Sequence, residues 1–200
     1  FGVVTRDARL SLGESAVFFG AGGIGLGAIL GAHLAGAHPI VAVDLHDHKL
    51  EKAREYGATH TFNAKKIADV DASILETVGA SGADVVVDGT GQPAVIEQCY
   101  RLTHPRGRTV LFGVMRHDKR VQLHTLPLHF GRVLTGSEGG GSMPSIDIPR
   151  IVRMMEADRF DADGFVSHRL SLSEINEGIA QLAKATEANP EQRQRWRRQA

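Results

Sequence analysis

The sequence predicts an α/β fold in which helices cover both faces of a doubly wound, six-stranded parallel sheet. Apolar, β-branched runs alternate with helical patterns from the N-terminal region to Gly141. The runs are apolar at nearly every position, as expected for strands that are buried on both faces of a parallel sheet. Right-handed crossovers between such strands place helices on both sides of the sheet.

The candidate strands are short and evenly spaced along the chain. In order they are AVFFG (16–20), PIVAVD (39–44), THTFN (59–63), ADVVVDG (83–89), RTVLFGV (108–114) and RVLTGSE (132–138), of which THTFN is the weakest. Helical patterns occupy 25–37, 46–58, 71–83 and 92–104. The first of these is apolar all round, which predicts burial. Gly57 is a helix-stop glycine and Pro93 suits a first helical turn.

The alternation stops after Gly141. A helix is expected over 145–160, an extended strand over 165–172, and an amphipathic helix over 171–185 with Ser171 or Ser173 as its N-cap. We therefore expect a cofactor-binding domain over 1–160 and a C-terminal strand–helix extension over 161–200.

Composition excludes several classes of function. The 200 residues carry no formal net charge, which gives no indication of a nucleic-acid or membrane partner. The arginines at 193, 195, 197 and 198 are interpreted as a solvated tail. Cys99, the only cysteine, can form no intramolecular disulfide and is expected to be a buried hydrophobe. Without an apolar run of ~20 residues, we expect a cytoplasmic protein.

Histidines and the first residue lead to two further expectations. The ten histidines include no pair whose spacing places both on one helical face, so no metal site is expected in this chain. The sequence begins with Phe1 rather than Met, which suggests a fragment or a processed chain.

A glycine-rich turn follows the first strand. GAGGIG, residues 20–25, fits the G-x-G-x-x-G pattern of dinucleotide-binding turns. Gly20 would allow a sharp turn, Gly22 a close approach of the backbone to a pyrophosphate, and Gly25 close packing of the helix on the sheet. The amides of Gly22, Gly23 and Ile24 would then point at the phosphates. Helix packing without a ligand is the alternative.

Asp44 ends the second strand, nineteen residues after Gly25, where the pattern expects an acid. A carboxylate there can accept both ribose hydroxyls of adenosine and would repel a 2′-phosphate, which favours NAD over NADP. The alternative is an aspartate that caps the next helix. Lys49 could lie over the adenine edge or the ribose, or be a surface lysine.

Five stretches, in the same order, resemble the zinc-type alcohol dehydrogenases of the medium-chain dehydrogenase/reductase superfamily. They are residues 10–59, then GADVVVDGTG, RGRTVLFGV, RVLTGSEGG and VSHRLSLSEINEGIAQL. The resemblance extends over roughly residues 1–186 and is specific for the superfamily but not for a substrate. It implies a Rossmann domain that binds NAD.

The resemblance also implies which residues contact the cofactor. They are the pyrophosphate turn Gly20, Gly22, Gly23, Ile24 and Gly25; the ribose acid Asp44 with Lys49; the adenosine-side loop Thr90 and Gly91; the nicotinamide strand end Phe112, Gly113 and Val114; and the adjoining Ser137 and Glu138. In this family the sixth strands pair across a dimer axis, which here implies a homodimer or homotetramer through Val133 to Glu138.

The family's catalytic zinc is held by an N-terminal domain that has no counterpart in this sequence. We therefore expect no zinc site and no catalytic residue in this chain, which alone would be inactive. Members of this family usually end with a short strand that contains an arginine. This sequence has TEANPEQRQRWRRQA at that place instead, so no arginine contact to the cofactor is carried over.

The predicted function is the cofactor-binding part of a dehydrogenase that transfers hydride between a primary or secondary alcohol, or a polyol, and NAD. The small-molecule partners would be NAD and an alcohol or carbonyl substrate. Two alternatives remain: a zinc-free NAD(P)H-dependent quinone or enone reductase of the same superfamily, and a non-catalytic nucleotide-binding or dimerisation module.

Overall fold

The computed structural model describes residues 1–187, with side chains described as far as Gln181. The chain divides into two compact units, residues 1–152 and 153–200. The arginine cluster expected to form a solvated tail lies outside the described residues. The predicted domain boundary at residue 160 stays a prediction.

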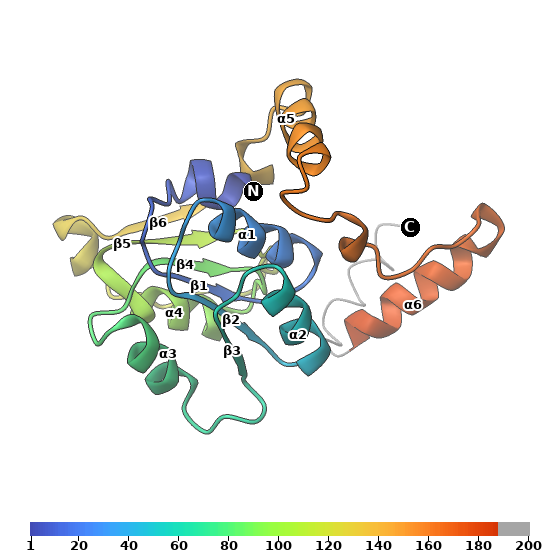
Figure 1. The fold of residues 1–200 in the computed structure, drawn as a ribbon. Coiled ribbons are helices and arrows are strands. Elements are labelled where there is room, and N and C mark those ends of the chain that lie inside the picture. The colour runs from blue at the N-terminus through green and yellow to red at the C-terminus, as the bar shows by residue number, and fades with distance from the viewer. Residues whose placement is uncertain (188–200) are drawn as a thin grey trace. The chain divides into compact units, whose positions relative to one another are not determined.

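The first unit contains a six-stranded sheet in the order β3-β2-β1-β4-β5-β6, with all neighbouring strands parallel (Figure 1). The strands are β1 (Ala16–Phe19), β2 (Ile40–Asp44), β3 (His60–Asn63), β4 (Ala83–Asp88), β5 (Thr103–Leu111) and β6 (Val133–Gly136). This order is that of a doubly wound Rossmann fold, so the predicted fold class is confirmed. The weak candidate THTFN is a true strand at one edge.

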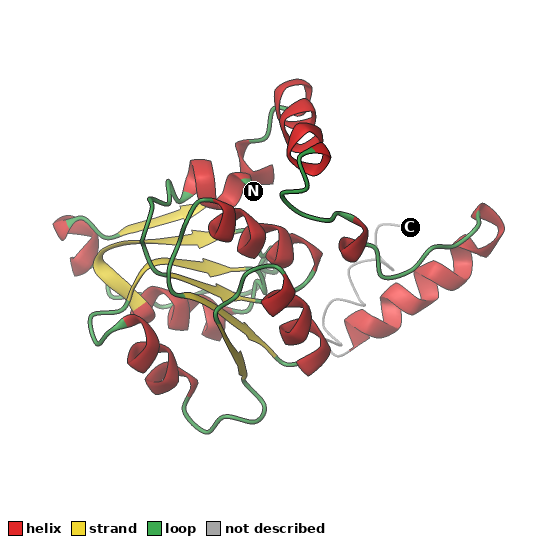
Figure 2. Ribbon diagram, viewed as in Figure 1, coloured by secondary structure: helices red, strands yellow, loops and turns green. Residues whose placement is uncertain are grey.

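Four helices connect the strands and cover the sheet. They are α1 (Gly23–Leu34), α2 (Asp47–Glu55), α3 (Val70–Val78) and α4 (Pro93–Leu102). α1 and α2 pack on one face, and α3 and α4 on the other (Figure 2). The burial predicted for α1 is confirmed along most of its length. Gly57 follows the last turn of α2 with a φ of 104°, as expected of a helix-stop glycine.

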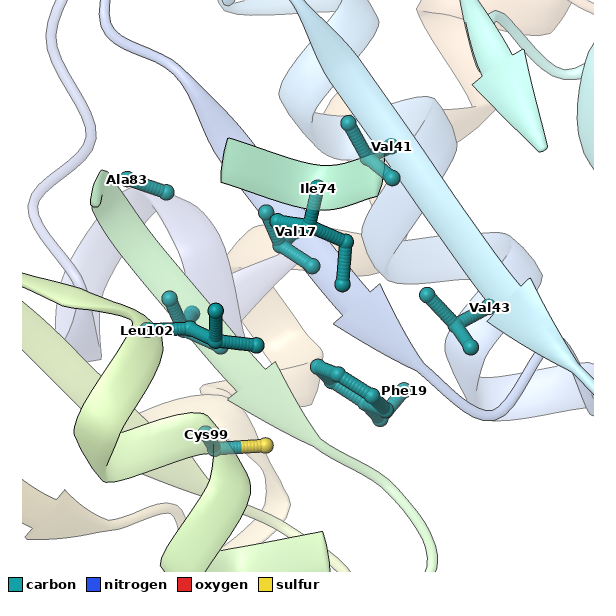
Figure 3. Packing of buried hydrophobic residues seen from close by; sticks show 9 residues of the cluster. Val17, Phe19, Val41, Val43, Ile74, Ala83, Cys99 and Leu102 are labelled. Atoms are coloured by element: carbon teal, nitrogen blue, oxygen red, sulfur yellow. The ribbon is translucent and has the colours of Figure 1, made fainter. Parts of the chain in front are cut away.

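Alternate residues of the central strands form the core beneath α3 and α4. Figure 3 shows Val17 and Phe19 of β1 beside Val41 and Val43 of β2. Because successive side chains of a strand point to opposite faces, one strand contributes to both layers of core. Cys99 of α4 is fully buried in this cluster, and burial raises the pKa of its thiol. It is therefore the buried hydrophobe that was predicted.

Several element boundaries differ from the predictions by up to five residues, and the two largest differences have identifiable causes. The helix expected to run to residue 83 ends at Val78, because Gly79 has a φ of 101° and leaves the helical region. β5 begins at Thr103, directly after α4, rather than at residue 108. In the second case the strand follows the helix directly, with no intervening turn residue to mark the boundary in the sequence.

The predicted strand over 165–172 is wrong. The structure has 3₁₀ turns η4 (Asp163–Phe165) and η5 (Leu172–Glu174), joined by unpaired backbone. A strand is stable only when a neighbouring strand pairs with it, and no strand among residues 1–187 pairs with this segment. The two expected helices form as α5 (Pro144–Glu156) and α6 (Ile175–Glu187), although α5 ends four residues before the predicted residue 160 and α6 begins four residues after the predicted residue 171.

Ser171 is the N-cap of η5, which leads into α6. It forms a capping box with Glu174, so one of the two predicted caps is confirmed. No helix in the described part of the chain has the length and apolar character needed to cross a membrane.

Ser15 and Asp84 link β1 to β4 at the amino ends of these strands. The N–H and hydroxyl of Ser15 donate to Asp84 Oδ2 over 2.9 and 2.8 Å, and the Ser15 hydroxyl accepts from the Asp84 N–H over 3.0 Å. Partial burial opposes ionisation of Asp84, but the hydrogen bonds from Ser15 outweigh it and lower the pKa of this carboxyl.

We expect Ser15→Ala to lower the free energy of unfolding at pH 7 by about 1–3 kcal/mol, because the hydroxyl's hydrogen bond to the Asp84 carboxylate and the one it accepts from the Asp84 N–H are both lost. Since the folded pKa of Asp84 is lowered, its stabilisation is complete above the ordinary aspartate pKa of about 4 and is lost as the pH falls through the folded value. Urea unfolding between pH 2.5 and 7 checks this. A deficit of Ser15→Ala that stays constant over this range would contradict it.

Candidate functional site

The carboxyl ends of the central strands lie level at one edge of the sheet. Phe19 of β1 pairs with Asp88 of β4, Asp88 with Leu111 of β5, and Leu111 with Gly136 of β6. The loops that follow these strands therefore meet at this edge. Because β1 lies between β2 and β4, with α1 and α4 on opposite faces, the edge includes the topological switch point where ligands bind in such folds.

The glycines of the turn after β1 serve two separate purposes. Gly20 has a φ of 97°, a backbone conformation that L side chains rarely adopt. A Cβ on Gly25 would overlap the carbonyl oxygen of Gly20. The absence of a side chain at Gly25 therefore lets the start of α1 pack directly against the turn. A Cβ on Gly22 or Gly23 would meet nothing within 4 Å. Packing thus explains Gly25, whereas open space lies in front of Gly22 and Gly23.

The first turn of α1 presents main-chain N–H groups toward this open space. Gly22 is the N-cap of α1, and among the described contacts no side chain accepts a hydrogen bond from the amides of the first turn as a cap would. Ile24 is 68% exposed, although it is apolar. An uncapped helix N-terminus carries a partial positive charge and suits an anion such as a phosphate.

Asp44 lies beside the turn and is hydrogen-bonded to it. Its side chain is 8% exposed, and Oδ2 accepts from the Ala21 N–H over 2.9 Å. Oδ1 accepts from the N–H groups of Leu45 and His46 over 2.7 and 3.1 Å. Lys49 Nζ is 3.9 Å from Oδ1. The carboxylate therefore joins the end of β2 to the glycine turn and keeps acceptor capacity for a further donor.

These contacts also bear on the interpretation of Asp44 as a cap. The N-cap of α2 is His46, and Asp44 accepts from the two amides just before that helix. It is therefore a local turn acceptor as well as a contact of the glycine turn.

Asp88 organises the loop after β4. Its side chain is fully buried; Oδ1 accepts from the Thr90 N–H and hydroxyl over 2.9 and 2.6 Å, and Oδ2 from the Gly91 N–H over 3.0 Å. Its carbonyl accepts from the N–H groups of Phe112 and Gly113, both over 3.0 Å. Burial raises the pKa of Asp88, although the hydrogen bonds oppose this.

The segments after β4 and β5 pack backbone against backbone. A Cβ on Gly113 would overlap the Gly91 nitrogen, and a Cβ on Gly91 would lie 2.5 Å from the Val114 carbonyl oxygen. The ring of Phe112 covers Gly89 so closely that a Cβ there would overlap it. The side chain of Val114 is 70% exposed. Thr90–Gly91 and Phe112–Val114 therefore form one packed unit.

The remaining predicted site residues lie along the same edge. Ser137 donates its N–H to the Leu111 carbonyl over 2.8 Å, and its hydroxyl accepts from the Gly140 N–H over 3.2 Å. Glu138 is exposed at the N-cap of η3 (Gly139–Gly141). A Cβ on Gly20 would lie 3.5 Å from Thr90 Cγ2, so the loops after β1 and β4 are in contact.

Asp84 and Asp88 are not a catalytic pair. They lie at opposite ends of β4, and each carboxylate has its own donors. Within residues 1–187, no group of three or more His, Cys, Asp or Glu side chains could hold a metal ion. The rings of His46 and His48 lie 5.6 Å apart, centroid to centroid.

The chain was compared with known families and proteins. The family described as zinc-binding dehydrogenase matches residues 23–157. Alcohol dehydrogenase class-3 of Cereibacter sphaeroides is 36% identical over 185 residues, which are 89% of this chain and 49% of that protein. The chain thus spans about half the length of the curated relatives it matches.

Two solved structures show the same fold. An alcohol dehydrogenase zinc-binding domain protein from Burkholderia ambifaria has a TM-score of 0.85 and 32% identity, over 92% of this chain and 49% of that one. A putative zinc-binding dehydrogenase from Sinorhizobium meliloti, bound to NADP, has a TM-score of 0.78 and 26% identity, over 89% of this chain and 51% of that one.

Proposed function

Because the chain belongs to the zinc-binding dehydrogenase family, we propose that it is the cofactor-binding part of an NAD-dependent alcohol dehydrogenase. The observation that carries this proposal is the open, uncapped turn at Gly22 and Gly23 with the Asp44 carboxylate beside it. The parent reaction would transfer hydride between the carbinol carbon of an alcohol and nicotinamide. Primary and secondary alcohols and polyols are the proposed substrate class.

The residues at the edge of the sheet are suited to a dinucleotide. The amides of Gly22, Gly23 and Ile24 would bind the pyrophosphate, and Asp44, with Lys49 beside it, the adenosine ribose. Thr90 and Gly91 would close over the adenosine side. The main chain of Phe112, Gly113 and Val114 would hold the nicotinamide carboxamide, with Ser137 and Glu138 completing that contact. When bound, the cofactor supplies the hydride acceptor, and this chain fixes its position.

Asp44 supports NAD rather than NADP as the cofactor. Its carboxylate is mostly buried and would repel a 2′-phosphate on the adenosine ribose, whereas it can accept from a free 2′-hydroxyl. The similar Sinorhizobium meliloti protein was solved with NADP bound, so this fold also accommodates the phosphorylated cofactor.

Zinc has no donor set in the described part of this chain. A catalytic zinc site needs three protein ligands and an open position, and the described His, Cys, Asp and Glu side chains form no such group. We assign to this chain only the cofactor side of the reaction.

We expect the 200-residue chain to bind NADH but not to oxidise alcohols. Isothermal calorimetry with NADH measures binding. Absorbance at the NADH band, after NAD is mixed with ethanol, benzyl alcohol or a polyol, measures alcohol oxidation. Gly22→Val, which places a side chain in the open space of the turn, is the control and should abolish NADH binding. No heat with millimolar NADH would overturn the proposal.

We also propose that β6 pairs with its copy in a homodimer, or in a homotetramer built from such dimers. β6 is an edge strand; its first residue, Val133, is 42% exposed, and Phe130, three residues before it, is 70% exposed. An edge strand with exposed apolar residues is an available pairing surface.

A cytoplasmic location is proposed from the single, buried cysteine, because a reducing compartment keeps thiols free.

A further inference from the structure

Asp88 joins the Thr90–Gly91 loop, which would close over the adenosine side of the proposed site, to the Phe112–Val114 segment on its nicotinamide side. Its carboxylate accepts three hydrogen bonds from Thr90 and Gly91, and its carbonyl accepts two from Phe112 and Gly113. Thr90–Gly91 in turn lies against Gly113–Val114 so closely that neither Gly91 nor Gly113 could carry a Cβ. A shift of the Thr90–Gly91 turn therefore has to displace the main chain after β5.

We propose that Asp88 is a positioning residue: its carboxylate sets the Thr90–Gly91 turn, and this turn fixes the main chain of Phe112–Val114 for the nicotinamide. This inference rests on the proposed function, since it assigns the nicotinamide to the segment after β5. Asp88 itself is fully buried and would not touch the cofactor.

The donor pattern around Asp88 requires a carboxylate. All three groups that face its side-chain oxygens are donors: two main-chain N–H groups and the Thr90 hydroxyl. An asparagine of the same shape could keep its oxygen against Thr90. Its NH₂ group would then face the Gly91 N–H, where the carboxylate oxygen lies at 3.0 Å, and two donors would oppose each other.

A buried carboxylate is costly, which argues that this acid serves a purpose besides stability. Burial raises the pKa of Asp88, so burying its charged form disfavours folding relative to an unperturbed carboxyl. Cys99 of α4 is a titratable neighbour of Asp88, and burial together with the charge of Asp88 raises the pKa of this thiol. The hydrogen bonds from Thr90 and Gly91 oppose the effect of burial on the Asp88 carboxyl and so compensate its charge.

The test compares NADH with ADP-ribose, which lacks the nicotinamide. In Asp88→Asn we expect NADH affinity to fall about tenfold more than ADP-ribose affinity, as for one mispaired hydrogen bond to a charged group. Asp84→Ala is the control, because Asp84 lies on the same strand and its carboxylate also accepts from a main-chain N–H and a hydroxyl, but at the opposite end of β4, away from the proposed site. It should leave the ratio of the two affinities unchanged, even where it destabilises the fold.

Equal losses of affinity for both ligands in Asp88→Asn, or the same change of ratio in Asp84→Ala, would overturn the positioning role. If Asp88→Asn does not fold, Thr90→Val serves instead, since it removes the hydroxyl that donates to Asp88 Oδ1 and accepts from the Gln92 N–H but leaves the carboxylate in place. It should shift the ratio in the same direction by a smaller factor, and an unchanged ratio would count against the proposal.

A second measurement separates this inference from the proposed function. Amide hydrogen exchange without ligand should be faster at Gly91, Phe112 and Gly113 in Asp88→Asn than in the unaltered chain. If the unaltered chain binds no NADH, the proposed function fails, but coupled exchange at these three amides would still support the link between the loops. Faster exchange at Gly91 alone would show that the link does not exist.

Discussion

Asp44→Ala is expected to weaken NADH binding roughly 10- to 100-fold, the range for losing hydrogen bonds to a charged group. Two effects act together. The ribose loses its acceptor, and the Ala21 N–H loses the carboxylate oxygen that ties the glycine turn to the end of β2. NADPH should lose less, or gain, because the negative charge that repels a 2′-phosphate is removed. The preference for NADH over NADPH should therefore narrow.

Calorimetric titration with NADH and NADPH measures this result. Asp47→Ala is the control, since Asp47 is an exposed acid three residues further on, paired with Lys66 and Asn63 instead of the turn. Asp44→Asn separates the effect of the negative charge from that of the side-chain acceptor, because it removes the charge but keeps one acceptor oxygen. An unchanged ratio of NADH to NADPH affinity in Asp44→Ala would remove this residue from the account of cofactor choice.

Gly25→Ala is expected to lower the free energy of unfolding by about 3 kcal/mol, near the upper end for overpacking a closed site. The added Cβ would overlap the Gly20 carbonyl oxygen, a main-chain atom that cannot rotate away. Relief requires α1 to move from the sheet or the turn to open. Because the same turn would carry the pyrophosphate contacts, NADH binding should be lost with it.

Gly23→Ala is the matched control for this substitution. It adds the same methyl group two residues earlier, where a Cβ would meet nothing within 4 Å, and alanine favours the helix over glycine by up to about 1 kcal/mol. Urea unfolding should show Gly25→Ala well below the unaltered chain and Gly23→Ala at or above it. Similar stabilities for the two variants would show that the turn does not rely on close packing at Gly25.

The limits of prediction from sequence are clearest at particular elements. THTFN was the weakest strand candidate because its outward residues are polar, yet it forms β3 because β2 offers it an unpaired edge. FVSHRLSL reads as a strand, but no described strand lies beside it to accept its hydrogen bonds. Local propensity describes what a segment can form, and pairing partners decide whether it forms.

Asp88 illustrates the same limit at the site. The sequence placed it at the end of a buried strand, near the cofactor, but assigned it no role there. Asp-Gly-Thr-Gly, residues 88–91, does contain a signal, since an aspartate that precedes a threonine and a glycine can accept from both of their amides. Its link to Phe112 and Gly113 joins residues more than twenty positions apart, and only the parallel pairing of β4 with β5 brings these together.

The sequence by itself determined the alternation of strands and helices, the dinucleotide-type turn at Gly20–Gly25 and the acid at Asp44, because these follow from periodicity and from spacing along one βαβ unit. Tertiary structure alone decided which glycine serves packing and which faces open space, and that Asp44 and Asp88 each tie separate loops together. Those properties depend on distances between segments that are remote in sequence, and such distances are set by strand order and register.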